Sequence, residues 1–305
     1  MKNIIVAIAL FALFGLSGCI GNGGGVNSSG VPKTLIIGMV ETEKIDELKK
    51  AREAIRKYLQ EKLKMPVQII YTNDYTGIIE ALKSNKIHMA EMPPFAYVIA
   101  TRAMQLTPIV TLGSNGKPIT YKSVLIVNAH SNLKTMDDVK ARASKLTLCF
   151  VDPASTSGHL IPRAYLTSIG LNPDSAFKQV IFAGSHSASV LSVKSNKIDV
   201  GCTTDLIFSL MTQAKMLSED DIRVIWRSAP IVSDPIVARS DLNKDFVKKV
   251  QNAYVDFNKE HPEILSKFTK IFFHDTLTRS YIPVQDSMYN GLRKIANSVK
   301  DLKAN

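Results

Sequence analysis

The sequence predicts an α/β protein made of two units, each a sheet of mostly parallel strands covered by helices. Short apolar runs of strand length alternate with longer, charged segments in which apolar residues recur at helical spacing. The links between these segments are short, which favours parallel strand pairing with helices on both faces of a sheet. The 305 residues are also enough to bury two hydrophobic cores.

The first unit is predicted in the N-terminal part of the chain. Its expected elements are a strand at 34–40, a helix at 45–63, a strand at 67–71, a helix at 77–83, a short strand near 88–91 and a helix at 95–104. In the first helix the residues Ile45, Leu48, Ile55, Leu59 and Leu63 form the apolar stripe.

The second unit is predicted to begin at Tyr121. Its expected elements are a strand at 121–128, a helix at 136–143, a strand at 146–151, a helix after Ser155, a strand at 179–182, a helix at 186–194 and a strand at 198–202. The final segment adds strands at 223–226 and 236–239 and helices at 245–260, 263–269 and 285–301. These closing helices are too many for the second unit, and the residues alone do not place them.

The N-terminus has the pattern of an export signal. Lys2 precedes thirteen apolar or small residues at 4–16, too few for the about 20 that span a bilayer. The string 16–19, LSGC, resembles a prokaryotic lipoprotein signal, which implies that residues 1–18 are removed and that Cys19 carries the lipid. An ordinary signal with an incidental cysteine is the alternative. Residues 19–30, rich in Gly, Asn and Ser, then form a flexible tether. We expect an extracytoplasmic protein held to the membrane by lipid.

Charge and cysteine content exclude several classes of function. The formal net charge is +11, but the basic residues are dispersed on predicted helix faces, for example at Lys49, Arg52 and Arg56, so nucleic-acid binding is not expected. A positive field favours anion capture, although a solvated basic surface is the simpler interpretation. Cys149 and Cys202 lie in apolar runs, where two buried thiols are favoured over a disulfide. The six histidines show no HExxH spacing or cluster, and we predict no metal or cofactor.

Three consecutive hydroxyl residues mark a candidate binding site. Ser155, Thr156 and Ser157 follow an apolar strand-like run that ends at Asp152-Pro153, and they stand where a helix should begin. A helix start offers free backbone N–H groups and the positive end of the helix dipole, so hydroxyl groups there complete a set of donors for a tetrahedral oxyanion. Ordinary N-capping is the alternative.

Further short segments accompany this triplet in a fixed order along the chain. They are NDY at 73–75, PFAY at 94–97, YKS at 121–123, DPASTSG at 152–158, GSHSASV at 184–190, KIDV at 197–200 and SDP at 233–235 with residues 236–242. In their order and separations they resemble the phosphate, phosphite and phosphonate family of extracytoplasmic solute-binding proteins that feed ABC importers. The resemblance covers the whole chain beyond the tether.

The resemblance implies a type II periplasmic-binding-protein clamshell with two mixed, mostly parallel sheets flanked by helices. One lobe would comprise 31–120 plus 234–305 and the other 121–233, with two crossing strands as the hinge. The ligand would lie in the cleft and be enclosed when the lobes close.

The resemblance also implies roles for individual residues. Ser155, Thr156 and Ser157 would bind the phosphoryl oxygens. Tyr75 and Tyr121 would reach the anion from two hinge-side loops, and His186 would donate a hydrogen bond to it. The alternatives are half-buried structural tyrosines and a solvated histidine beside a helix cap. For His159, a surface position is as plausible as a site.

Two aspartates would determine specificity. Asp234 matches a family aspartate before proline and would accept a hydrogen bond only from a ligand oxygen that keeps its proton, as in phosphonate, phosphite or phosphate but not sulfate. A turn aspartate is the alternative. Asp205 falls where aminoalkylphosphonate binders carry a glutamate for the amine, or it simply caps the helix that starts at 206. Pro93 replaces a usual glycine and stiffens a cleft loop.

The sequence therefore predicts a lipid-anchored, monomeric binding protein that captures a phosphorus oxyanion, with a phosphonate favoured over phosphite or phosphate, and delivers it to an ABC transporter permease. No catalysis is expected. The alternatives are an exported phosphate-ester hydrolase using Ser155, His186 and Asp234, and a sensor subunit that presents ligand to a membrane receptor. The sequence lacks the GxSxG elbow that would favour a hydrolase.

Overall fold

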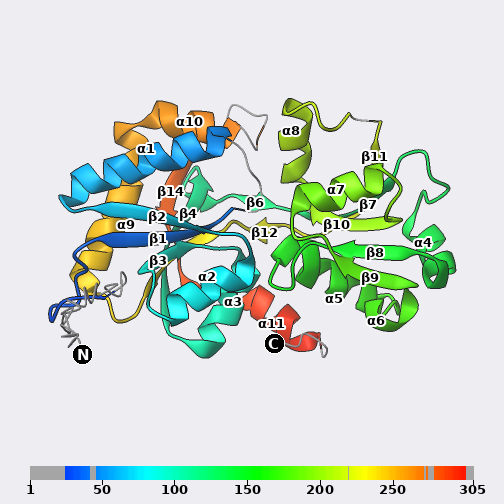
Figure 1. Ribbon diagram of the computed structural model, residues 1–305, viewed down its shortest axis with the longest axis horizontal. Coiled ribbons are helices and arrows are strands. Elements are labelled where there is room, and N and C mark those ends of the chain that lie inside the picture. The colour runs from blue at the N-terminus through cyan, green and yellow to red at the C-terminus, as the bar shows by residue number, and fades with distance from the viewer. Residues whose placement is uncertain (1–24, 42–45, 219, 271–272, 274–277, 300–305) are drawn as a thin grey trace, which may run out of the picture.

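The computed structural model describes residues 25–41, 46–218, 220–270, 273 and 278–299, and it forms two α/β lobes side by side (Figure 1). The first lobe is built from both ends of the chain. Its elements are β1 (Leu35–Val40), α1 (Asp46–Leu63), β2 (Val67–Thr72), α2 (Tyr75–Lys83), β3 (Met89–Glu91), α3 (Pro94–Ala103), β4 (Leu106–Ser114), β5 (Lys117–Pro118), β13 (Pro235–Arg239), α9 (Lys244–Glu260), α10 (Pro262–Lys270), β14 (Ser280–Pro283), the 3₁₀ turn η3 (Asp286–Tyr289) and α11 (Asn290–Ser298).

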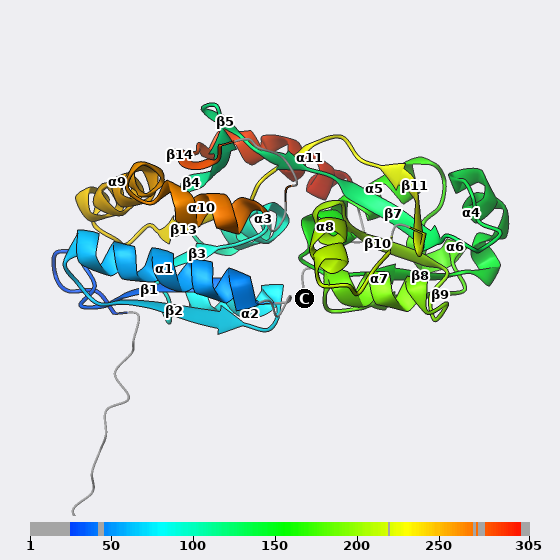
Figure 2. The same ribbon diagram turned by 90° about the horizontal axis from the view of Figure 1, so that it is seen from above.

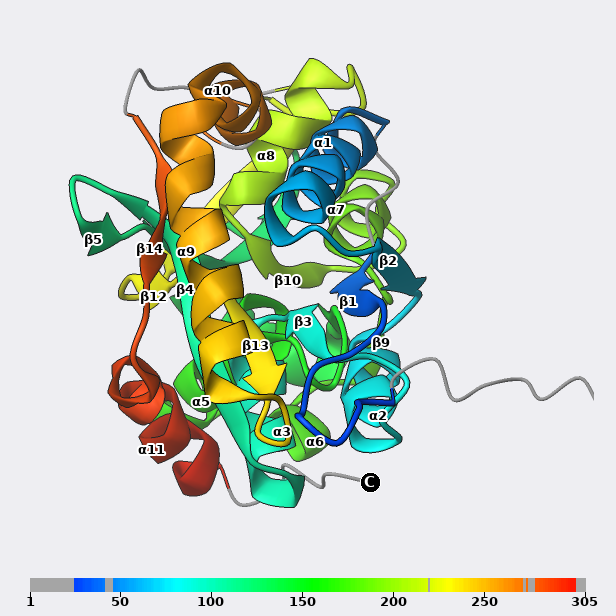
Figure 3. The same cartoon turned by 90° about the vertical axis from the view of Figure 1, so that its left-hand side faces the viewer.

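The sheet of the first lobe has the strand order β14-β4-β13-β3-β1-β2, with β5 attached to β4. Strand β1 pairs in parallel with β2 and β3, whereas β13, β4, β14 and β5 join by antiparallel pairs. Helices α1, α9 and α10 cover one face, as Figure 3 shows from the side, and α2, α3 and α11 cover the other. The sheet is mixed, but antiparallel pairs outnumber the parallel pairs that were expected to dominate.

Three strands of this sheet, β4, β5 and β14, were missing from the sequence-based prediction. Pro108 interrupts the apolar run of β4 and removes a backbone donor, which usually argues against a central strand. A register shift between Ile236 and Val237 of the neighbouring β13 accommodates it, because the residue between Pro108 and Val110 has no direct partner. Helix α11 is also shorter than the predicted 285–301, since its first turn is the 3₁₀ turn η3.

The second lobe is formed by the middle of the chain. Its elements are β7 (Ser123–Asn128), α4 (Met136–Arg142), η1 (Ala143–Lys145), β8 (Thr147–Phe150), η2 (Thr156–Leu160), α5 (Ile161–Ser168), α6 (Pro173–Ala176), β9 (Gln179–Phe182), α7 (His186–Lys194), β10 (Val200–Thr204), α8 (Leu206–Gln213) and β11 (Ile222–Arg227). The strand order is β11-β7-β10-β8-β9, with β8 parallel to β9 and β10, and β7 antiparallel to β10 and β11.

The alternation of side chains along these strands explains the state of the two cysteines. Cys202 packs on the face that α4 and α5 cover, whereas Cys149 on the neighbouring strand packs on the face that α7 and α8 cover. Both are buried free thiols. Side chains on opposite faces of a sheet cannot form a disulfide without backbone movement, so the favoured reading of buried thiols is confirmed.

A two-stranded antiparallel sheet, β6 (Thr120–Tyr121) with β12 (Ile231–Val232), connects the lobes (Figures 1 and 2). The backbone N–H of Ser233 donates to the carbonyl of Ile119 at 3.0 Å and extends this ladder by one bond. The chain crosses between the lobes along these two strands. They form the two-strand hinge of the clamshell.

The predicted signal peptide and Cys19 lie outside the described residues. The end of the predicted tether is described and packs on the first lobe: Val26 bridges Pro32, and the carbonyl of Gly30 accepts a hydrogen bond from the N–H of Asn243 at 2.9 Å. Gly30 has a φ of +75°, and a Cβ there would meet the Asn243 nitrogen at 2.9 Å, so this contact requires glycine. Across the described ranges, the helices are all too short or too polar to cross a membrane.

Candidate functional site

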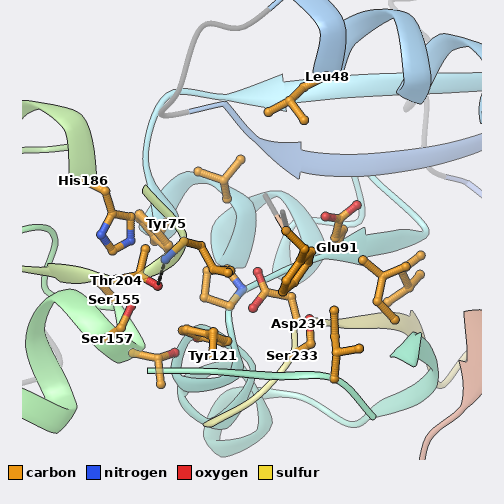
Figure 4. Close-up of a pocket in the computed structure, with 18 of the residues that line it drawn as sticks. Leu48, Tyr75, Glu91, Tyr121, Ser155, Ser157, His186, Thr204, Ser233 and Asp234 are labelled. Carbon is orange, nitrogen blue, oxygen red and sulfur yellow. Dashed lines mark hydrogen bonds between the residues drawn. The ribbon is translucent and has the colours of Figure 1, made fainter. Parts of the chain in front are cut away.

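A cavity of about 210 Å³ lies between the lobes at the hinge. Its lining includes seven of the eight predicted ligand residues, which Figure 4 shows in part: Tyr75, Tyr121, Ser155, Thr156, Ser157, His186 and Asp234. The volume lies below the range typical of drug-sized ligands, so the cavity suits a small solute.

The hydroxyl triplet lies at the start of a wide helical turn. Ser155 is the N-cap of η2, and its Oγ accepts a hydrogen bond from the N–H of Gly158 at 3.1 Å. The N–H of Leu160 donates to the carbonyl of Ser155, the spacing of a π turn, and helix α5 continues from there. A Cβ on Gly158 would lie 2.4 Å from Val151, so only glycine lets the turn pack this closely on the strand end. The first N–H groups of such a turn have no partner within the helix and remain free for an anion.

Contacts across the cleft hold this turn against the first lobe. The N–H of Phe95, in the first turn of α3, donates to Thr156 Oγ1 at 2.9 Å. Asp152, in the second lobe, is held by hydrogen bonds from the backbone N–H groups of Ala154 and Tyr75. Burial raises the pKa of its carboxyl, and these two hydrogen bonds lower it. Because Phe95 and Tyr75 belong to the first lobe, the two walls of the cavity are already in contact. Pro93 and Pro94, which lack an N–H, make Phe95 the first donor of its helix.

The two tyrosines reach the cavity from regular elements and not from the loops that were expected. Tyr75 is the first residue of α2, behind Asp74, whose carboxylate caps the helix by accepting from the N–H of Gly77 at 2.6 Å. Tyr121 ends the hinge strand β6. Burial raises the pKa of Tyr121 and the charge of Asp234 raises it further, so the phenol keeps its proton at neutral pH and can donate a hydrogen bond to an anion.

His186 begins α7 directly after the N-cap Ser185. It is half-buried, lines the cavity and lies 3.0 Å from Thr203 Oγ1 through its Nδ1. Burial lowers the pKa of His186 to about 4, so the ring is neutral at physiological pH. When the Thr203 hydroxyl donates to Nδ1, the other ring nitrogen carries the proton and is a neutral donor.

Asp234 lies between the hinge strand β12 and β13, and its carboxylate faces the cavity. Burial raises the pKa of Asp234 to about 7, the charge of Glu91 adds to this rise and Arg52 opposes it. The carboxyl is therefore partly protonated at neutral pH. It can donate a hydrogen bond to an oxyanion when protonated and accept one when ionised.

Asp205 and His159 are placed differently from the predictions. Asp205 is not among the cavity residues, although its neighbours Thr204 and Leu206 are; its carboxylate accepts from the N–H of Lys122 at 2.9 Å and does not cap α8. His159 is buried, not on the surface. Its Nδ1 bonds the carbonyl of Pro153 at 2.7 Å and its Nε2 accepts from Arg163 at 2.8 Å, so both ring nitrogens serve the second lobe.

Two charged residues of the cavity, Arg52 and Glu91, were not predicted from the sequence. Arg52 was assigned to a solvated helix face, but its side chain is only 13% exposed. Its position four residues after Leu48 and three before Ile55 places it on the apolar stripe of α1, and this spacing was a usable signal. Among the described residues, no group of three or more His, Cys, Asp or Glu side chains is placed to hold a metal ion.

Known proteins resemble this chain along most of its length. The phosphonates-binding periplasmic protein of Escherichia coli is 29% identical over 93% of this chain and 83% of that protein. The phosphate-import protein PhnD of Mycolicibacterium smegmatis is 26% identical over 88% of this chain and 87% of that protein. Among solved structures, PhnD1 of Prochlorococcus marinus in complex with methylphosphonate has a TM-score of 0.73 at 22% identity, covering 87% of this chain and 97% of that one.

A sequence model of one family matches residues 37–289, most of the described chain. That family is described as the periplasmic substrate-binding protein of ABC phosphonate transporters. The match agrees with the two-lobed fold, the hinge and the cavity between the lobes. The chain belongs to this family of periplasmic substrate-binding proteins of ABC transporters.

Proposed function

We propose that this protein captures a phosphorus oxyanion, with a phosphonate as the preferred ligand, and delivers it to the permease of an ABC importer. The observation that carries the proposal is the convergence of seven predicted ligand residues on one small cavity between the lobes. Neutral donors dominate the end formed by η2: the hydroxyls of Ser155, Thr156 and Ser157, and the imidazole of His186. Such donors suit a tetrahedral oxyanion at a helix start.

Asp234 supplies the selectivity within this proposal. A monoprotonated phosphonate, phosphite or phosphate donates its proton to the ionised carboxylate, or a dianionic ligand accepts one from the protonated carboxyl. In both cases ligand and Asp234 share one proton. Sulfate has no proton at neutral pH, so it binds only to the fraction of protein in which Asp234 is protonated, and the pKa of about 7 makes this rejection dependent on pH.

The protein acts by binding, without making or breaking a bond. Support comes from the partners of the residues that a hydrolase would need: Ser155 Oγ accepts from Gly158 and His186 Nδ1 contacts Thr203. Among the described residues no hydrogen bond joins Ser155 to His186, as a nucleophile and its base would require. Turnover of a phosphate ester by the pure protein would instead favour the hydrolase.

Lobe closure and anchoring complete the proposal. Residues 31–120 with 234–305 form one lobe and 121–233 the other, and the β6–β12 hinge lets them close on the ligand. The mature protein is a monomer that Cys19, modified with lipid, holds at the outer face of the membrane. Retention of a Cys19→Ala variant in the membrane fraction would contradict the anchor. Capture of a receptor, and not of a permease, in a ligand-dependent pull-down would favour the sensor alternative.

A thermal-shift panel on soluble protein starting at residue 25 tests the ligand class. The ligands are phosphate, phosphite, methylphosphonate, 2-aminoethylphosphonate, sulfate and taurine. A tight ligand at a thousandfold excess over its dissociation constant should add about 4 kcal/mol of apparent stability. Stabilisation by a phosphorus oxyanion supports the proposal, and stabilisation by sulfate or taurine alone would overturn it.

A further inference from the structure

The cavity continues beyond the oxyanion end to a second polar region on the first lobe. In Figure 4, Glu91 and Asp234 lie to one side of Tyr121, whereas Ser155, Ser157 and His186 lie on the other side. Arg52 lines the same cavity and lies beside Glu91. We call Arg52 and Glu91 the distal pair. A small oxyanion such as methylphosphonate has no group for it.

Arg52 has unused hydrogen-bonding capacity. Its Nε is buried and has no hydrogen-bond partner. Its Nη2 lies 3.8 Å from Glu91 Oε1, which is too long for a hydrogen bond. The guanidinium also lies 5.8 Å from the centre of the Tyr71 ring, at the outer limit of a cation–π contact. A buried donor without a partner costs free energy, so the binding of a ligand acceptor that reaches the guanidinium is favoured.

Glu91 has the complementary property. It ends β3, and its side chain is 25% exposed. Within the described ranges its carboxylate accepts no hydrogen bond and has only the loose contact with Arg52. Its charge raises the pKa values of Asp234 and of the buried Tyr281, two other residues that line the cavity. The carboxylate can therefore accept hydrogen bonds from a cationic ligand group.

Resting on the proposed function, we infer that the distal pair binds the aminocarboxylate end of a phosphonate amino acid. The guanidinium of Arg52 takes the ligand carboxylate through its planar N–H groups, and Glu91 accepts from the ligand ammonium. A ligand with only a carboxylate would face the like charge of Glu91, and one with only an amine would face Arg52. A zwitterionic end matches both charges, and Leu48 and Ile236 line the space beside it. This assigns amine recognition to Glu91 and not to Asp205.

Calorimetric titration with matched ligands tests the inference. The ligands are phosphonoalanine, its homologues with one and two further methylene groups, methylphosphonate, and alkylphosphonates of equal length without the amino and carboxyl groups. We expect at least one phosphonate amino acid to bind at least tenfold more tightly than the alkylphosphonate of its length. Arg52→Gln should lower that affinity at least tenfold and change the affinity for methylphosphonate less than twofold.

The matched control is Arg56→Gln, one turn further along α1, because Arg56 pairs with Glu53 and does not line the cavity. It should change neither affinity. The double variant Arg52→Gln/Glu91→Gln removes both charges without leaving one of them unpaired. It keeps the test valid if the single variant fails to fold. The double variant should bind methylphosphonate normally and lose the preference for the phosphonate amino acid.

The outcomes separate this inference from the proposed function. If no phosphonate binds the wild-type protein, the proposed function fails. If methylphosphonate binds but the phosphonate amino acids show no advantage over their alkyl counterparts, the inference alone is overturned. It is also overturned if the double variant keeps the preference.

Discussion

The two ends of the cavity use opposite chemistry. At the η2 end, the groups are neutral and firmly held: Ser155 caps its own turn, Thr156 receives the N–H of Phe95, and His186 contacts Thr203. At the distal end, Arg52 and Glu91 are charged and meet only loosely. Pre-organised neutral donors bind any tetrahedral oxyanion with little reorganisation, whereas loosely paired charges respond to what the rest of the ligand carries. Affinity and specificity therefore lie in different regions of one cleft.

The largest expected effect is on the η2 end as a whole. In Gly158→Ala, the new Cβ would lie 2.4 Å from Val151 and 2.9 Å from Ser155 Oγ, so the turn must shift and every donor with it. We expect loss of measurable binding for all oxyanions and a decrease of about 1–3 kcal/mol in the free energy of unfolding. Calorimetry and denaturant unfolding measure the two effects. Gly291→Ala in α11, where a Cβ meets nothing within 4 Å, is the control and should bind normally.

The next effect isolates one hydroxyl. Thr156→Val keeps the shape but removes an oxygen that serves both the ligand and Phe95. A hydrogen bond to a charged group contributes about 1.5–3 kcal/mol, so affinity for phosphonate, phosphate and phosphite should fall about 10- to 100-fold alike. Thr156→Ser should restore most of it. An effect on one oxyanion only would show that the η2 end determines specificity as well as affinity.

A smaller effect is expected for His186, because its ring is only half-buried, whereas Thr156 is fully buried and also holds the N–H of Phe95. His186→Ala should weaken methylphosphonate binding about 2- to 10-fold. Since burial holds the pKa of His186 at about 4, the ring stays neutral above pH 6 and this ratio should be the same at pH 6 and pH 8. Titrations at both values measure it. A much larger ratio at pH 6 would mean that the ring binds as a cation.

The smallest effect concerns sulfate and Asp234. Below its pKa of about 7 the carboxyl is protonated and donates, and above it the carboxylate repels a dianion. Weak sulfate binding to the wild-type protein should therefore increase as the pH falls from 8 to 6, whereas Asp234→Asn should bind sulfate more tightly at pH 8 and show no such dependence. Competition against methylphosphonate measures both. Sulfate binding independent of pH in the wild-type protein would show that Asp234 does not reject sulfate.

Sequence patterns correctly predicted the structural features that depend only on residues close together in the chain. The hydroxyl triplet at a helix start, and the strands β1, β2 and β8, were found from spacing and composition alone. Strand β4 was missed because Pro108 is tolerated only through a bulge that involves a strand distant in the chain. Arg52 was missed because a basic residue on an amphipathic helix usually faces solvent, although its place on the apolar stripe of α1 indicated that it could be buried. The pKa of Asp234 arises from burial among residues that the fold brings together.

A crystal structure of the protein with methylphosphonate tests the division of the cleft most directly. We predict that the phosphonate oxygens lie within hydrogen-bonding distance of Ser155, Thr156, Ser157 and a tyrosine hydroxyl, with one oxygen on Asp234, and that the methyl group points toward Arg52 and Glu91. A phosphonate group bound on Arg52, with the hydroxyl triplet free of ligand, would contradict the assignment of the two ends.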